Sequence, residues 1–155
     1  IDIDGYVVAD FEMFKVLVDS IGGVEVEVSE KEAKEVTSHK GRYGNVKLDA
    51  GKYKLTGEQA LAYCRNRYLG TDFGRTERQR KVLEAVIRKL PQTLLTNSTG
   101  LFDGLLPNLT TNLTKAECVR LGLMGAGALT YEITADSIPQ PGTWQDATIR
   151  KKLIV

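Results

Sequence analysis

The chain has 155 residues, 42% of them hydrophobic, so it can bury one core and does not have the composition of a disordered tail. Its 21 basic and 20 acidic side chains nearly cancel, and a net charge of +1 argues against a protein that binds nucleic acid through a global basic field. No apolar run approaches the roughly 20 residues of a membrane span, and the two cysteines are too few for a disulfide framework.

The first part of the chain predicts a strand, a helix and a second strand. Residues 1–8 alternate weakly between apolar and polar side chains, as a strand or a lead-in segment does. Asp10 precedes a run of apolar side chains on one helical face, so it is the expected cap of a helix that Gly22 and Gly23 end. Residues 24–28 alternate valine with glutamate, which indicates a half-buried strand with an acidic outer face.

A short polar helix and a solvated loop are expected next. Ser29 and Glu32 have the spacing of a capping box, and the helix that they begin is expected to end near Val36. Residues 39–45 are rich in lysine, glycine and arginine, which is typical of a loop in solvent.

The middle of the chain predicts a hairpin followed by a helix. Residues 46–48 and 53–55 lie on either side of a turn, and this pattern favours two paired strands. Thr56 and Gln59 form a second capping box, so the hairpin should lead directly into a helix.

The last part predicts a long helix, a connector, a helix and two strands. Residues 93–112 form a polar connector, with three Asn-x-Ser/Thr patterns that match glycosylation sequons but serve equally well as turn chemistry. Thr114 and Glu117 form a third capping box, for a helix that is expected to end among the glycines at 122, 125 and 127. Residues 128–133 and 148–155 are the expected final strands.

Strands alternate with helices throughout, so the expected class is α/β, most simply a three-layer α-β-α sandwich with a mixed central sheet. The predicted hairpin argues against a purely parallel sheet, because paired hairpin strands are antiparallel. One domain, or most of one, accounts for the length.

The long helix after Gly74 places charge where its core face should begin. Extended backwards, its apolar stripe has Gln79 near the centre, Arg75 slightly off it and Arg78 at the margin. Inward-facing guanidiniums are costly unless they meet an anion, and a helix N-terminus adds unpaired amides. The stripe itself consists of Val82, Leu83, Val86, Ile87 and Leu90.

Two further arginines, Arg65 and Arg67, end the preceding helix, and a glycine-containing connector could bring them toward Arg75 and Arg78. Planar guanidinium forks suit phosphate or pyrophosphate, so this cluster predicts an anion site. The alternative is a solvated basic face with Asp72 and Glu77 as surface partners.

Cys64 lies beside Arg65, which permits a nucleophile hypothesis because a nearby cation lowers a thiol pKa. Free cysteines are mostly buried packing residues, and the single histidine, His39, lies in a polar loop with no expected route to Cys64. Together with Cys118, this cysteine lacks the Cys/His set of a zinc site.

Three stretches resemble the LytR-CpsA-Psr family of bacterial cell-envelope proteins. They are residues 4–28 with the glycine pair at 22 and 23, residues 48–68 with the R-x-R motif, and residues 72–79 with the D-x-x-R-x-x-R-Q motif. The resemblance is strong over residues 1–90 and looser over residues 112–155.

The resemblance implies a membrane-anchored phosphotransferase on the extracytoplasmic face. It would move a glycopolymer, such as a teichoic acid, from a polyprenyl pyrophosphate carrier to a peptidoglycan acceptor. The pyrophosphate would be held by Arg65, Arg67, Arg75 and Gln79, with Arg78 in the same motif, and an apolar channel would hold the polyprenyl tail. Candidates for lining that channel are Phe11, Phe14, Leu83 and Ile87.

The family also implies a magnesium cofactor, an N-terminal anchor and further strands whose residues lie upstream of the segment that matches Ile1. On this basis no metal ligands or catalytic residues are assigned in residues 1–155, and this stretch alone is expected to be inactive. The alternative function is a non-catalytic module that binds anionic envelope polymers or lipids. Nucleic acid is not an expected partner.

Overall fold

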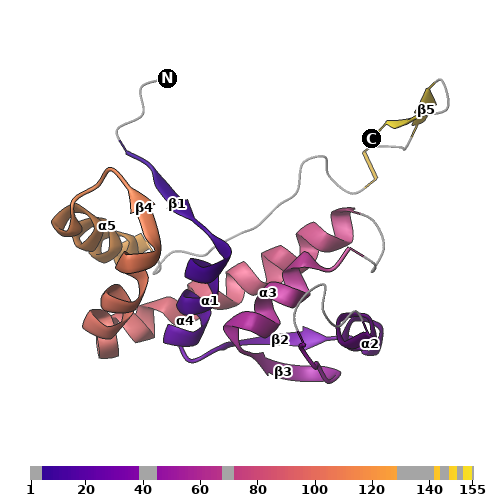
Figure 1. Cartoon of the computed structure of the whole chain (residues 1–155), viewed down its shortest axis with the longest axis horizontal. Helices are drawn as coiled ribbons and strands as arrows, with labels where there is room; N and C mark the ends of the chain where they lie inside the picture. The colour runs from indigo at the N-terminus through magenta and orange to yellow at the C-terminus, as the bar shows by residue number, and fades with distance from the viewer. Residues whose placement is uncertain are drawn as a thin grey trace.

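The computed structural model of the chain describes residues 5–38, 45–67, 72–128, 142–143, 147–149 and 152–154. Helices and strands alternate along these residues, which confirms the predicted α/β class (Figure 1). The strands are β1 (Val7–Ala9), β2 (Val24–Val28), β3 (Gly51–Leu55), β4 (Leu109–Thr111), β5 (Ala147–Ile149) and β6 (Lys152–Ile154). The helices are α1 (Phe11–Ser20), α2 (Glu30–Ser38), α3 (Gly57–Arg65), α4 (Asp72–Leu105), the 3-10 helix η1 (Leu106–Asn108) and α5 (Lys115–Ala128).

Side-chain caps fix the starts of the helices where the sequence predicts them. The carboxylate of Asp10 accepts from the N–H of Met13 at 2.7 Å. The hydroxyl of Thr56 accepts from the N–H of Gln59, whose side-chain oxygen accepts in return from the Thr56 N–H. The same reciprocal bonds join Ser29 to Glu32 and Thr114 to Glu117. These local predictions are confirmed, although α2 continues to Ser38 and α5 to Ala128.

The predicted hairpin within residues 46–55 is wrong, because β3 pairs with β2 instead. The two strands are antiparallel, from Val24 opposite Leu55 to Val28 opposite Gly51. Residues 46–48 do not form a strand because their main chain bonds to side chains. The Leu48 N–H donates to the hydroxyl of Thr37 at 3.1 Å, and that hydroxyl lies 3.3 Å from the Leu48 carbonyl, to which it donates.

The core lies between β2 and three helices. The valines of β2 point inward and are buried, whereas Glu25 and Glu27 point outward, as their alternation predicts. Helices α1, α3 and α4 contact one another, and α4 also contacts β2 (Figure 1). The largest fully buried side chains are Tyr63, Leu55, Val18, Val24, Val28, Val36, Val82 and Asn66.

The turn from α1 to β2 is held by a lysine from α4. Gly22 and Gly23 have φ angles of 73° and 80°, a left-handed conformation that glycine adopts without strain. The ammonium group of Lys89 donates to the Gly22 carbonyl at 3.0 Å and to the Gly23 carbonyl at 2.7 Å. The predicted turn is thus confirmed, and a distant side chain reinforces it.

The predicted connector at residues 93–112 is largely helical. Helix α4 runs through Pro91 as far as Leu105 and bends at Asn97, whose φ of −150° and ψ of 52° are not helical. The Asn97 side-chain oxygen accepts from the N–H of Gly100 at 3.2 Å, in the manner of an N-cap. The polar residues that suggested a connector therefore begin a second helical segment.

After this bend the chain returns toward its start, where β4 pairs with β1 from Val7 opposite Thr111 to Ala9 opposite Leu109. The expected final strand, residues 148–155, is two short paired strands, β5 and β6. Apart from residue 128, the last of α5, the expected strand at 128–133 lies outside the described residues, as does the loop at 39–44. Each described strand has a single antiparallel partner, so these residues do not themselves form the predicted mixed central sheet.

Candidate functional site

The position of α3 is fixed at its beginning by α1. The carboxylate of Asp19 accepts from the N–H of Gly57 at 2.7 Å. A Cβ atom on Gly57 would lie 2.2 Å from the carbonyl oxygen of Lys15, so only glycine allows the two backbones to approach this closely. The far end of α3, which carries Arg65 and leads to Arg67, is thereby held against the beginning of α1.

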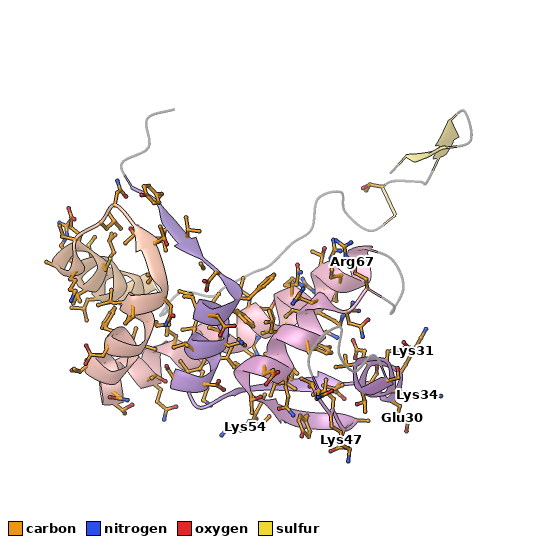
Figure 2. The ribbon with its side chains drawn as sticks, viewed as in Figure 1. Glu30, Lys31, Lys34, Lys47, Lys54 and Arg67 are labelled. Carbon is orange, nitrogen blue, oxygen red and sulfur yellow. The ribbon has the colours of Figure 1, made fainter. Side chains whose placement is uncertain are left out.

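Arg65 is the last residue of α3, and Arg67 follows the C-cap residue Asn66. Asn66 has a ψ of 122°, which turns the chain out of the helix, and it is fully buried. The side chains of Arg65 and Arg67 are both exposed (Figure 2 labels Arg67). The guanidinium carbon of Arg65 lies over the ring of Phe11, 4.5 Å from its centroid. This contact joins the end of α3 to the first residue of α1.

Arg78 is the buried arginine of the cluster, with only 4% of its surface exposed. Its Nε donates to the carbonyl of Tyr63 at 3.3 Å, and its Nη2 donates to the carbonyl of Asn66. Carbonyls at the end of a helix lack intrahelical donors, so this guanidinium supplies what the last turn of α3 needs. Arg78 therefore joins the beginning of α4 to the end of α3.

Arg75 and Gln79 lie one helical turn apart on one flank of α4, at i and i+4. Arg75 is half-buried, and its Nη1 atom is withdrawn from solvent, as its expected inward position requires. Gln79 is exposed, as are Lys81 and Arg88, so it is not a core residue although the stripe has it near its centre. The inward row consists of Arg78, Val82 and Val86, each four residues from the next.

Four of the predicted site residues lie near the bonds of Arg78 along the chain, and we call Arg65, Arg67 and Arg75 with Gln79 the arginine corner. Arg78 bonds to Asn66, which stands between Arg65 and Arg67. Arg75 lies one turn before Arg78 on α4, so these residues belong to the end of α3 and the beginning of α4, which Arg78 joins.

Of the two acidic residues expected as surface partners, Glu77 pairs within its own helix. The Glu77 carboxylate pairs with Arg80, one turn along α4, at 2.7 Å. The side chain of Asp72 lies outside the described residues.

A hydrogen bond between Tyr63 and Glu32 connects α3 to α2. The buried Tyr63 hydroxyl donates to Glu32 of α2 at 3.0 Å. Burial, and then the charge of Glu32, raise the pKa of Tyr63 well above its usual range. Burial opposes ionisation of Glu32, but the N–H and hydroxyl of Ser29 and the Tyr63 hydroxyl donate to its carboxylate, so its pKa lies below the ordinary value.

Cys64 is a packing residue. It is 8% exposed, and burial raises the pKa of its thiol to about 12, although the charge of Arg78 acts in the opposite direction. A thiol with this pKa is almost entirely protonated at neutral pH and is a poor nucleophile. Both Cys64 and Cys118 are free thiols.

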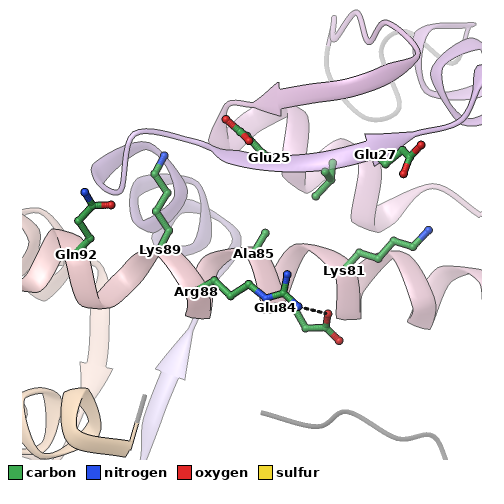
Figure 3. Close-up of a pocket in the computed structure, with 9 residues that line it drawn as sticks. Glu25, Glu27, Lys81, Glu84, Ala85, Arg88, Lys89 and Gln92 are labelled. Carbon is green, nitrogen blue, oxygen red and sulfur yellow. Dashed lines mark ion pairs between the residues drawn. The ribbon is translucent and has the colours of Figure 1, made fainter. Parts of the chain in front are cut away.

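A groove of about 570 Å³ lies between β2 and α4, away from the corner (Figure 3). Arg88 lines it and stands nine residues after Gln79, which at about 100° per residue places it on the opposite side of α4. Three carboxylates and three cations line the groove, so it has no excess of positive charge for an anion. These charged residues are Glu25, Glu27, Glu84, Lys81, Arg88 and Lys89.

Two features are missing from the part of the chain that the structure describes. It contains no group of three or more His, Cys, Asp or Glu side chains that could hold a metal ion. None of its helices is both long enough and apolar enough to cross a membrane.

The family of the chain follows from comparison with known proteins. A family model described as the LytR_cpsA_psr family matches residues 1–153, nearly the whole sequence. The chain belongs to this family. The resemblance seen in the R-x-R and R-x-x-R-Q motifs is therefore confirmed.

Members of the family with names and structures are similar to most of this chain. It is 32% identical over 149 residues to the polyisoprenyl-teichoic acid–peptidoglycan teichoic acid transferase TagU of Enterococcus faecalis, covering 94% of this chain and 46% of TagU. It is 38% identical over 94 residues to the TagV transferase of Bacillus subtilis, covering 58% of this chain and 23% of TagV. A solved structure described as TagT bound to LI-WTA superposes with a TM-score of 0.69 at 30% identity. It covers 99% of this chain and 54% of TagT, so the chain spans about half the length of its relatives, or less.

Proposed function

We propose that this LytR-CpsA-Psr chain is part of an extracytoplasmic transferase that moves a glycopolymer of the teichoic acid type from a polyprenyl pyrophosphate carrier to peptidoglycan. A relative that matches 94% of it carries the name of such a transferase. The observation that carries the proposal is the bond from Arg78 to Asn66, because it holds Arg65 and Arg67 beside the beginning of α4. In this proposal the arginine corner binds the pyrophosphate.

The roles within the corner follow from burial. Exposed Arg65 and Arg67 and half-buried Arg75 offer guanidinium forks, and exposed Gln79 offers an amide, to phosphate oxygens. Arg78 directs its Nε and Nη2 donors at main-chain carbonyls. We therefore assign Arg78 the role of holding the corner together rather than that of a principal ligand.

The same flank of α4 changes from charged to apolar along its length. Arg75, Gln79 and Leu83 follow one another at intervals of four residues. The apolar side chain of Leu83 is unusual in that 58% of the residue is exposed. A ligand with an anionic head and an apolar tail matches this order. Leu83 is thus our first candidate for contact with the polyprenyl chain, and Phe11, Phe14 and Ile87 remain candidates.

The transfer forms a bond from an acceptor oxygen of peptidoglycan to the phosphorus that bears the glycopolymer. It breaks the bond from that phosphorus to the bridging oxygen, and polyprenyl phosphate leaves. Negative charge grows on the leaving oxygens, where positioned guanidiniums stabilise it. No residue described here is assigned as the base that takes the proton of the acceptor hydroxyl.

Magnesium remains part of the proposal for the whole protein, but the described residues do not fit a site for it, because they contain no suitable group of carboxylates. The steps above therefore use only side chains of this chain.

The test is transfer of labelled glycopolymer from polyprenyl pyrophosphate to peptidoglycan by the full-length protein. Arg65→Ala and Arg67→Ala should each reduce transfer strongly, and Arg88→Ala, which removes an arginine on the opposite side of α4, should not. Binding of the carrier without release of polyprenyl phosphate would favour the alternative, a non-catalytic binding module. Absence of both binding and transfer would refute the proposal.

A further inference from the structure

Phe11 has an unusual environment for an aromatic side chain. It is the first residue of α1, and 56% of its surface is exposed. The guanidinium carbon of Arg65 lies 4.5 Å from the centre of its ring. An exposed apolar ring at a helix start has little packing to stabilise it, so the cation is the notable contact of this side chain.

We infer that Phe11 is a positioning residue for the anion site, and that its ring holds the Arg65 guanidinium ready to bind phosphate. The inference rests on the proposed function of the arginine corner. A long arginine side chain loses conformational freedom when it binds a ligand, and a contact that restrains it beforehand reduces that loss.

An aromatic ring suits this task better than a carboxylate does. On α4, for comparison, Glu77 restrains Arg80 through an ion pair of 2.7 Å. That ion pair also neutralises much of the charge of Arg80. The π-face of Phe11 attracts a cation through its quadrupole and carries no net charge. Arg65 can therefore be held in place while it keeps its full positive charge for an anion.

The ring has a fixed place relative to Arg65 because both helices are anchored. Asp10 caps α1 immediately before Phe11. Asp19, at the other end of α1, bonds to the start of α3, where Gly57 allows backbone contact. The α1–α3 packing therefore sets the distance from the ring to the guanidinium.

A competing role for Phe11 is contact with the polyprenyl tail, which the sequence also suggests. The two roles can be distinguished by which ligands bind more weakly when Phe11 is replaced. A positioning role affects a pyrophosphate without any lipid, whereas a contact with the tail affects only ligands that carry one.

The experiment is calorimetric titration of the full-length protein with inorganic pyrophosphate at low ionic strength. Phe11→Leu should weaken binding roughly two- to fivefold, the effect of one exposed cation–π contact, and Phe11→Tyr should restore it. Tyr6→Leu is the matched control, since Tyr6 is a half-exposed aromatic residue immediately before β1, and it should bind as the wild type does. In an Arg65→Ala background, Phe11→Leu should have no further effect.

The outcomes separate this inference from the proposed function. If the wild-type protein does not bind pyrophosphate, the function proposed for the corner fails. If it binds and Phe11→Leu binds equally well, or if Phe11→Leu weakens binding just as much without Arg65, the positioning role is overturned. An effect confined to polyprenyl-linked ligands assigns Phe11 to the tail and also overturns it.

Where Phe11→Leu fails to fold, fluorinated phenylalanines at position 11 preserve the shape of the ring while weakening its quadrupole. Affinity for pyrophosphate should then fall stepwise with each added fluorine. A constant affinity across the series would contradict the inference.

Discussion

The guanidinium of Arg78 donates to the main-chain carbonyl of Tyr63, a bond that joins the start of one helix to the end of another. Arg78 is 4% exposed and Tyr63 is fully buried, so water cannot replace this donor. The R-x-x-R-Q motif, which supplies Arg75 of the corner, thus also supplies the arginine that joins the two helices.

Replacing Arg78 by alanine should therefore destabilise the fold. The buried carbonyls of Tyr63 and Asn66 would each lose a charged donor, and we expect the free energy of unfolding to fall by about 2 to 4 kcal/mol. Urea denaturation followed by circular dichroism measures this change. Arg88→Ala is the control, because the Arg88 side chain is 82% exposed, and its effect should stay within about 0.5 kcal/mol. Unchanged stability with lost pyrophosphate binding would instead make Arg78 a ligand.

Arg75→Ala should weaken binding of the pyrophosphate carrier with little loss of stability. Removing one of several neighbouring cations relieves repulsion in the absence of ligand, whereas the complex loses charge-assisted bonds of about 1.5 to 3 kcal/mol. This corresponds to binding that is roughly ten- to 150-fold weaker. Arg75→Lys should recover only part of it, because an ammonium group lacks the bidentate fork. Wild-type affinity of Arg75→Ala would remove Arg75 from the site.

Gly57→Ala should destabilise the protein severely, since its Cβ would stand 2.2 Å from the Lys15 carbonyl oxygen and force α1 and α3 apart. We expect a loss of more than about 3 kcal/mol, as for other large steric conflicts in a core. Gly125→Ala is the matched control. Nothing lies within 4 Å of its Cβ position in α5, so alanine there should stabilise the helix by up to about 1 kcal/mol. Equal stability of the two variants would contradict the close α1–α3 contact.

Glu32 should make stability depend on pH. Its pKa in the folded protein lies below the ordinary value of 4.5, so ionised Glu32 stabilises the fold above pH 4.5, and this contribution is lost as the pH falls through the folded-state pKa. Glu32→Gln should lower the free energy of unfolding at pH 7, and the difference from wild type should narrow below about pH 4.5. Ser29→Ala, which removes one donor to Glu32, should reproduce part of the effect. A difference that is constant from pH 7 to pH 3 would show that Glu32 does not contribute through its charge.

Local patterns in the sequence predicted where the helices begin. Strand pairing, which depends on partners distant in the sequence, was predicted less well. A capping box such as Thr56 with Gln59 is complete within four residues, so the sequence contains all of its chemistry. The pairing of β3 with β2 depends on residues that lie 23 to 31 positions apart, and the bond of the Thr37 hydroxyl to the main chain of Leu48 cannot be inferred from spacing. The predicted hairpin failed for this reason.

The arginine cluster was predicted from the helical stripe, but the centre of that stripe was misplaced. The predicted stripe includes Leu83, which is 58% exposed, and including it moves the centre of the stripe toward Gln79. With Val82 and Val86 alone, the spacing of four residues leads back to Arg78. The contact of Arg65 with Phe11 had no signal in the sequence, since 54 positions separate the two residues.

The bend at Asn97 redirects the chain so that two distant strands can pair. A straight helix would carry residues 98–105 about 12 Å further along the axis of α4, away from the start of the chain. Instead the chain turns at one asparagine and comes back, so that Thr111 meets Val7 across more than 100 positions of sequence. The alignment of β4 with β1, and the orientation of α5 beyond it, thus depend on the two backbone angles of one residue. A variant that straightens the bend would separate β1 from β4 without changing a residue of either strand.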